Sequence, residues 1–292
     1  MFKRFLLVVL IFAGRSVYAR EPKEVREANT KALFNMVLSV ETATSDVSRL
    51  PVDKSDFYKK RALRKIEESK HLLAEIDHKI AGNRAKEILQ NLEAAASKLS
   101  SGTPSDKVVQ ALRNISKMIV EAYQVETAPA LVPDLEHGRK IYVSTCASCH
   151  GATGEGQGPL VSDRMQPKPP NYLDARFMDN VSPFRIFHVL SIGMDTELMP
   201  SYEQMLNVEE RWAVAFFVFQ MRYPKGRLTE KQLAAIAADT GLDLKQIAWL
   251  TDNELRSRLA SAPKGAFPLK SDPVGLVRTD VAFFKALARS SR

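Results

Sequence analysis

The sequence of 292 residues has only two cysteines, Cys146 and Cys149. An exported protein that relies on disulfides for stability usually has several cysteines with long loops between them. Here a bridge would close a very short loop and would hardly restrict the unfolded chain. Stabilisation by disulfides is therefore excluded as the reason for these two cysteines, which must have another use.

Long apolar segments are also missing. An apolar run over residues 5–13 follows two basic residues, and it is far shorter than the roughly 20 residues that cross a bilayer as a helix. Together with the small-residue pattern over 17–19, it predicts a signal peptide over residues 1–19. An uncleaved membrane anchor is the alternative, but no later segment is long and apolar enough to span. We therefore expect an exported, periplasmic protein with no intrinsic membrane span after cleavage.

Charge of one sign does not dominate the chain. It has 42 basic and 34 acidic residues and a net charge of +8, and loss of residues 1–19 would leave 39 basic residues and a net charge of +5. This mild excess permits an acidic protein partner or a membrane surface and does not require nucleic acid. The run KKRALRK over residues 59–65 lacks interleaved aromatic side chains, so we expect no nucleic-acid partner. It is either a solvated helix surface or a docking patch for an acidic partner.

Strand signals are nearly absent from residues 22–125. Four segments there each carry one apolar stripe, with apolar residues recurring every three or four positions, as in amphipathic helices. The stripes consist of Val25, Ala28, Ala32, Met36 and Val40; Ile66, Leu73, Ile76 and Ile80; Ala85, Ile88, Leu92, Ala95 and Leu99; and Val108, Leu112, Ile115, Ile119 and Ala122. Short connections containing proline or glycine separate the stripes. This pattern predicts an antiparallel four-helix bundle over residues 20–126.

The remainder of the chain divides into three parts. Residues 126–133 resemble a linker, and residues 134–223 combine short helices with loops rich in glycine and proline. Residues 227–292 predict a helical C-terminal extension that is too interrupted to fold alone, so we expect it to pack on its neighbours. The predicted fold class is all-α: an N-terminal helical bundle, a middle domain that contains both cysteines, and a small helical C-terminal segment.

Both cysteines belong to the segment Cys146-Ala147-Ser148-Cys149-His150, in which a histidine directly follows the second thiol. This is the attachment pattern of c-type haem. Two thiols on one irregular helical turn can each add to one vinyl group of the same porphyrin, and the next residue then projects its imidazole at the iron. We expect one covalently attached haem c, bound through Cys146 and Cys149, with His150 as an iron ligand.

Two other uses of paired cysteines fit this sequence less well. A thioredoxin-like redox pair should follow a strand in a βαβ context, and no such context is visible. A zinc site would lack its remaining close-set thiol or histidine ligands.

The segments around the motif occur in the order found in a known family. They are HGRKIYVSTCASCHG with Gly138 and Tyr142, then GEGQGPL, SPFRIFHVLSIG, GMDTELMPSY and the closing VEERWAVAFFVFQM. In this order, residues 134–222 resemble a class I cytochrome c. The resemblance implies a cytochrome c domain over residues 134–223, with a closing helix that crosses the first one.

An electron carrier of this kind needs a second axial ligand on the iron, and a thioether would raise its potential relative to a second imidazole. Met199 precedes Pro200, lies 49 residues after His150, and stands in an irregular loop that resembles the methionine loop of the family. Met194 is the alternative. The resemblance also implies that the backbone carbonyl of Pro159 accepts a hydrogen bond from the His150 ring.

The expected function is that of an exported monohaem c-type cytochrome, which carries single electrons between redox protein partners. An iron held by both His150 and Met199 has no open position, which argues against a haem enzyme. The whole chain also resembles, vaguely, the exported portion of cytochrome-fused iron permeases. The alternatives are therefore a redox module for iron uptake beside a membrane permease, an electron-accepting subunit of a periplasmic dehydrogenase, or a binding module in which the haem senses redox state.

Overall fold

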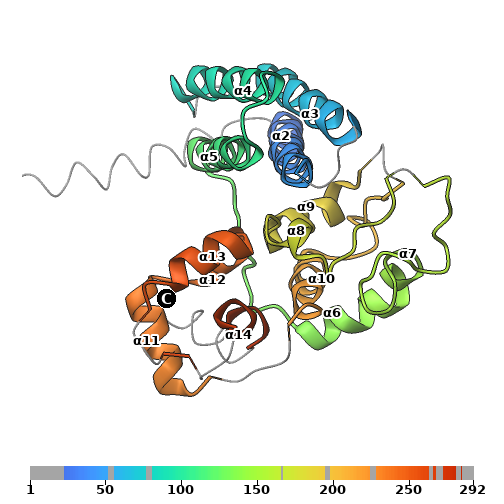
Figure 1. Cartoon of the computed structure of the whole chain (residues 1–292), viewed down its shortest axis with the longest axis vertical. Coiled ribbons are helices and arrows are strands. Elements are labelled where there is room, and N and C mark those ends of the chain that lie inside the picture. Colours follow the sequence, from blue (N-terminus) through green and yellow to red (C-terminus); the bar gives the residue numbers. More distant parts are fainter. Residues whose placement is uncertain are drawn as a thin grey trace, which may run out of the picture. The chain divides into compact units, whose positions relative to one another are not determined.

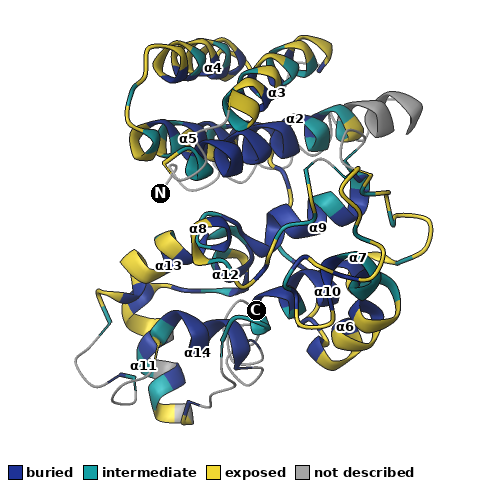
Figure 2. Ribbon diagram, turned by 45° about the vertical axis from the view of Figure 1, so that its right-hand side comes forward, coloured by how far each residue is buried: buried dark blue, intermediate teal, exposed yellow. Residues whose placement is uncertain are grey.

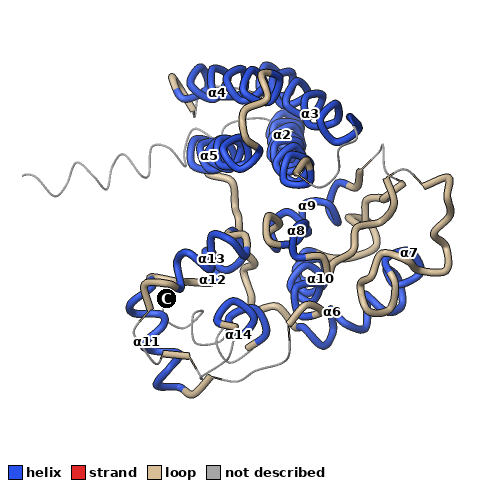
Figure 3. The backbone as a smooth tube through the Cα atoms, viewed as in Figure 1, coloured by secondary structure: helices blue, strands red, loops and turns tan. Residues whose placement is uncertain are grey.

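Figure 1 shows a computed structural model of the whole chain. It describes residues 23–51, 56–76, 81–165, 167–194, 198–223, 228–262, 266–267, 272–280 and 284. Within these residues the elements are helices joined by loops (Figure 3), and the all-α prediction is confirmed. The described helices include none that is both long and apolar enough to cross a membrane. The predicted signal peptide, 1–19, lies outside the described residues.

The chain divides into two compact units, Met1–Val125 and Glu126–Arg292. The helices of the first unit are α2 (Lys23–Arg49), α3 (Asp56–Glu75), α4 (Arg84–Ser100) and α5 (Ser105–Tyr123). α2 packs against α3 and α5, and α4 packs against the same two helices. The described residues of each predicted stripe lie on one of these helices, except Ile76, which directly follows α3.

The apolar stripes form the core of the first unit. Most of their side chains are buried: Met36, Val40, Ile66, Leu73, Ile76, Ala85, Ile88, Leu92, Ala95, Leu99, Val108, Leu112, Ile115, Ile119 and Ala122. Ala32 is half-buried, and the side chains of Val25, Ala28 and Ile80 lie outside the described residues. Burial of one stripe on each helix is the driving force expected for such a helical unit.

Two ion pairs join the helices of the first unit in its interior. Arg61 on α3 donates from Nε to Asp46 Oδ2 on α2 over 2.7 Å, and Arg113 on α5 donates to Glu41 Oε1 over 2.7 Å. All four side chains are at most 7% exposed. Arg61 belongs to the basic run 59–65, so this run is not entirely a solvated surface. Arg61 is a structural residue that connects α3 to α2.

The second unit begins with the elements of the middle domain. They are α6 (Leu135–Ile141), the π-helix η1 (Tyr142–Cys146), α7 (Ala147–His150), α8 (Ala175–Met178), α9 (Pro183–Ile192) and α10 (Val208–Gln220). α6 packs closely on α10. A methyl group on Gly138 would collide with the backbone carbonyl of Ala213, so only glycine permits this approach. The first and last helices of the middle domain therefore pack closely, as expected.

The C-terminal extension belongs to the same compact unit as the middle domain. Its helices are α11 (Glu230–Thr240), α12 (Leu244–Trp249), α13 (Asp252–Leu259) and α14 (Pro273–Thr279). α14 packs against α10, and α12 packs against α9. Figure 2 shows that α14 and most of α10 are buried. The extension thus covers faces of the middle domain, as expected from its short and interrupted helices.

A buried acid connects the extension to the middle domain. The Asp252 carboxylate, fully buried at the start of α13, accepts hydrogen bonds from Arg278 (2.8 Å), Arg222 (2.9 Å) and the Tyr223 hydroxyl (2.7 Å). Burial, together with the nearby charge of Asp252, raises the pKa of Tyr223, so its hydroxyl stays protonated and donates. One carboxylate therefore connects α13, α14 and the chain just after α10.

Candidate functional site

The CASCH segment lies on an irregular helical turn. Cys146 is the last residue of the π-helix η1, and Cys149 and His150 follow on the single turn α7. π-helical turns are rare and often occur at functional sites. Cys146 is buried, Cys149 is half-buried, and both are free thiols. The hydroxyl of Tyr142, which precedes the segment, donates to the carbonyl of Gly151, which follows it, over 2.8 Å. This hydrogen bond joins the two ends of the segment.

The loop that follows lies against α7 and satisfies its terminal carbonyls. The backbone N–H of Gly156 donates to the His150 carbonyl (2.8 Å), and that of Gly158 donates to the Cys149 carbonyl (3.1 Å). A methyl group on Gly158 would collide with the Ser148 carbonyl. The glycines before Pro159 thus allow the loop to approach the turn that carries the thiols.

The His150 imidazole is held in the neutral form that can ligate a metal. The side chain is 8% exposed, and burial lowers its pKa to about 4. Its ring stacks on Tyr172, with centroids 5.0 Å apart and planes inclined by 13°. In this position Nδ1 is buried and makes no hydrogen bond with any described residue. The hydrogen bond from the His150 ring to the Pro159 carbonyl stays a prediction.

Met199 lies in a loop that hydrogen bonds hold on the last turn of α9. The backbone N–H of Met194 donates to the Met199 carbonyl over 2.8 Å, so the two methionines form an isolated β-bridge. Leu198 has a φ of 56°, which is uncommon for a residue other than glycine, and its side chain is 76% exposed. Both candidate ligands, Met199 and Met194, thus belong to one strained loop, and both are half-buried.

Tyr202, three residues after Met199, links the methionine loop electrostatically to the CASCH segment. Burial raises the pKa of Tyr202, and Cys146 and Cys149, whose thiolates would repel a Tyr202 phenolate, raise it further. Burial raises the pKa of Cys146 itself to about 12, and the neighbouring Cys149 adds to this effect. The candidate site thus consists of the Cys146 and Cys149 thiols, the neutral imidazole of His150 and the loop that carries Met199.

Sequence reasoning missed part of this site. It did not identify Tyr202, whose pKa responds to both cysteines, because no local motif marks that residue. It also did not identify the stacking of Tyr172 on His150, which is a tertiary contact.

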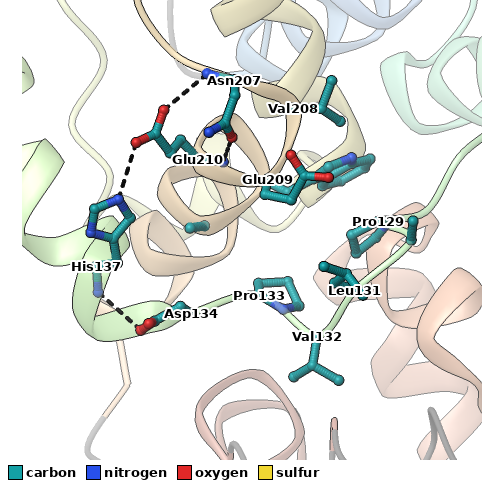
Figure 4. A pocket seen from close by; sticks show the side chains of 13 residues that line it. Pro129, Leu131, Val132, Pro133, Asp134, His137, Asn207, Val208, Glu209 and Glu210 are labelled. Atoms are coloured by element: carbon teal, nitrogen blue, oxygen red, sulfur yellow. Dashed lines mark hydrogen bonds and ion pairs between the residues drawn. The ribbon is translucent and has the colours of Figure 1, made fainter.

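A separate pocket lies between the linker and the start of α10 (Figure 4). It has a volume of about 280 Å³ and is lined by residues 129–134 and by residues of α10 and its N-cap. At its edge His137 and Glu210 are paired over 3.2 Å. Cys146, Cys149, His150 and Met199 are not among its lining residues. The pocket is therefore distinct from the site around the thiols.

Comparison with known proteins agrees with the geometry. The family model for cytochrome c matches residues 135–222, which is under a third of the chain. Searches of curated proteins and of solved structures found no match. The free thiols of Cys146 and Cys149 and the neutral, buried His150 fit a covalently attached haem c. The chain thus contains a cytochrome c domain over residues 135–222, a domain that binds haem and transfers electrons.

Proposed function

We propose that the protein is an exported, periplasmic monohaem cytochrome that carries single electrons between redox protein partners, with His150 and Met199 as axial ligands of its iron. The observation that carries the proposal is the match of the cytochrome c family model to residues 135–222, which include both the CASCH segment and the methionine loop. The His150 imidazole beside the two cysteines is neutral and buried, which supports its role as a ligand.

Each residue has a distinct task in this proposal. Cys146 and Cys149 would hold the porphyrin by thioether bonds, and the neutral imidazole of His150 would ligate the iron. Met199 would supply a soft sulfur as the second protein ligand, which favours the reduced iron. The haem, when bound, supplies a one-electron change between ferric and ferrous iron. With both protein ligands bound, no metal position would be open to a substrate, which favours a carrier over an enzyme.

Replacement of the proposed ligand tests the proposal. The ferric holo-protein should show the methionine–iron charge-transfer band, and Met199→Leu should abolish it and lower the reduction potential, because the thioether is lost. Met194→Leu is the matched control in the same loop and should leave the band and the potential unchanged. Loss of the band in Met194→Leu with retention in Met199→Leu would assign the ligand to Met194 and contradict the proposal.

Mass spectrometry of the mature protein tests the attachment and the export. The mass should include one haem and lack residues 1–19. Cys146→Ser and Cys149→Ser should each lose one thioether bond. Two free thiols and no added haem mass in the exported protein would contradict the proposal.

A further inference from the structure

The C-terminal extension reaches the helix that carries the methionine loop. Trp249, the last residue of α12, packs edge-on against Phe184 in the first turn of α9, with ring centroids 5.0 Å apart and planes at 65°. Phe184 is fully buried, and its ring also lies 4.2 Å from that of His188 on the same helix. A residue outside the cytochrome c domain thus completes the packing of α9.

Arg278 fixes the end of α12 that carries this tryptophan. Its guanidinium donates to the carbonyls of Ile247 (2.5 Å) and Leu250 (2.6 Å) and to the Asp252 carboxylate (2.8 Å). The two carbonyls flank Trp249 in the sequence, and Arg278 is fully buried. The planar fork of an arginine can make all three bonds at once, which a lysine ammonium cannot do in the same geometry. Arg278 therefore fixes the position of Trp249.

The extension also holds the chain just before α9. The backbone N–H of Asn253 donates to the Asp179 carbonyl over 3.0 Å. The Asp179 carboxylate pairs with Arg222 over 2.6 Å, and Arg222 in turn pairs with Asp252. Asp179 ends α8 shortly before Ser182 caps the N-terminus of α9. The first turn of α9 is thus held from two sides by contacts that depend on the extension.

The other end of α9 carries the methionine loop. The Ser201 hydroxyl donates to the Ser191 carbonyl over 2.7 Å, and the Tyr202 N–H donates to the Leu190 carbonyl over 2.8 Å. Met199 shortly precedes Ser201 and Tyr202 in the sequence, and it also forms the β-bridge with Met194. Because a packed helix of ten residues moves as a rigid element, a displacement at its first turn is transmitted to the loop at its last turn.

We propose that Arg278 and Trp249 of the C-terminal extension are positioning residues for Met199: they fix α9 and thereby set how readily the thioether leaves the iron. This inference rests on the proposed ligation by Met199. Both residues act through Phe184 and α9. The C-terminal extension would thus determine how strongly the Met199 thioether is held on the iron.

The experiment uses the full-length holo-protein and imidazole as a competing ligand for the ferric iron. Arg278→Gln and Trp249→Leu should bind imidazole about tenfold more tightly than the wild type, since a larger share of molecules has the thioether detached. Both should also show a weaker methionine–iron band. Arg258→Gln, an exposed arginine in the same extension with one 3.4 Å hydrogen bond to the Thr240 carbonyl, is the matched control and should behave as the wild type. Circular dichroism establishes that each variant remains folded.

The outcomes separate this inference from the proposed function. Folded holo-variants with the imidazole affinity and band of the wild type would overturn the positioning role. If Arg278→Gln gives no holo-protein, Trp249→Leu decides alone, because it keeps the acceptors and the guanidinium of the Arg278 cluster. A wild type without a band that depends on Met199 would overturn the proposed ligation, and the inference with it.

Discussion

The two compact units bury charge in different ways. Among the described residues of the first unit, each buried acid has an arginine as its ion-pair partner: Glu41 pairs with Arg113 and Asp46 with Arg61. Each pair connects two helices. In the second unit one fully buried acid, Asp252, pairs with two arginines and also accepts a hydrogen bond from Tyr223.

This difference has a mechanical consequence. Separate pairs can each be lost while the other still joins its helices. A shared carboxylate holds several elements through one group, so its loss loosens all of them together. The second unit, which contains the haem site, therefore depends more strongly on a single residue than the first unit does.

The largest effect is expected for the shared acid. Asp252→Asn removes the negative charge between Arg222 and Arg278, both buried, and should lower the free energy of unfolding of the second unit by about 3–5 kcal/mol. Urea unfolding followed by haem absorbance reports this unit, and far-ultraviolet circular dichroism reports the whole chain. Asp239→Asn, an exposed acid on α11, is the control. A decrease in the free energy of unfolding no greater than that of the control would show that Asp252 does not hold these elements together.

A separate pair in the first unit should cost less and should be repairable. Arg113→Met leaves the Glu41 charge buried and should lower the free energy of unfolding by roughly 3 kcal/mol. The double variant Glu41→Leu/Arg113→Met replaces the pair by apolar groups and should recover most of the loss, because no buried charge remains. Urea unfolding followed by circular dichroism measures both. Arg64→Met on the exposed face of α3 is the control. A double variant as unstable as the single one would contradict the interpretation.

The two units also differ in how far the sequence predicts them. In the first unit, periodicity alone identifies core residues such as Ile88 and Leu92, because a helix presents one face at a time. Periodicity does not identify the partner of a buried charge. Glu41 and Arg113 are 72 positions apart, and only the packing of α2 on α5 brings them together.

The haem site likewise contains residues that a local motif predicts and residues that only tertiary packing brings together. Cys146, Cys149 and His150 are recognisable because the chemistry of attachment requires a fixed local spacing. Tyr202 and Trp249 are not recognisable in this way, because their roles depend on where the methionine loop and the extension pack. The stacking of His150 on Tyr172 is likewise a tertiary contact, and no spacing rule predicts it.

The close approach of α6 to α10 in the cytochrome c domain requires a glycine at position 138, and its disruption should have a medium effect. Gly138→Ala places a methyl group against the Ala213 carbonyl, so α6 and α10 must separate. The expected loss is about 2 kcal/mol in the free energy of unfolding of the second unit, as for an overpacked core. Thermal unfolding of the holo-protein measures it, with Lys140→Ala on the exposed face of α6 as the control. Equal stability of the two variants would show that α6 does not need this close approach.

The smallest effect concerns the first turn of α10, and it depends on pH. The Asn207 N–H donates to Glu210 over 2.9 Å, and His137 on α6 lies 3.2 Å from the same carboxylate. The Asn207 bond, and to a lesser degree His137, lowers the pKa of Glu210 below its usual 4.5. The carboxylate therefore stabilises the fold above pH 4.5, and this stabilisation is lost as the pH falls through the lowered pKa.

Glu210→Gln should consequently lower the free energy of unfolding by up to about 1 kcal/mol at pH 7, as for the loss of a capping group. The gap to the wild type should close in acid, once the wild-type carboxyl is protonated. Urea unfolding at both pH values measures the gap. The matched control is Glu209→Gln, at the exposed neighbouring position. A gap that persists unchanged in acid would mean that the shape of the side chain, rather than its charge, holds α10 to α6. The His137 pair would then contribute no more than an ordinary surface contact.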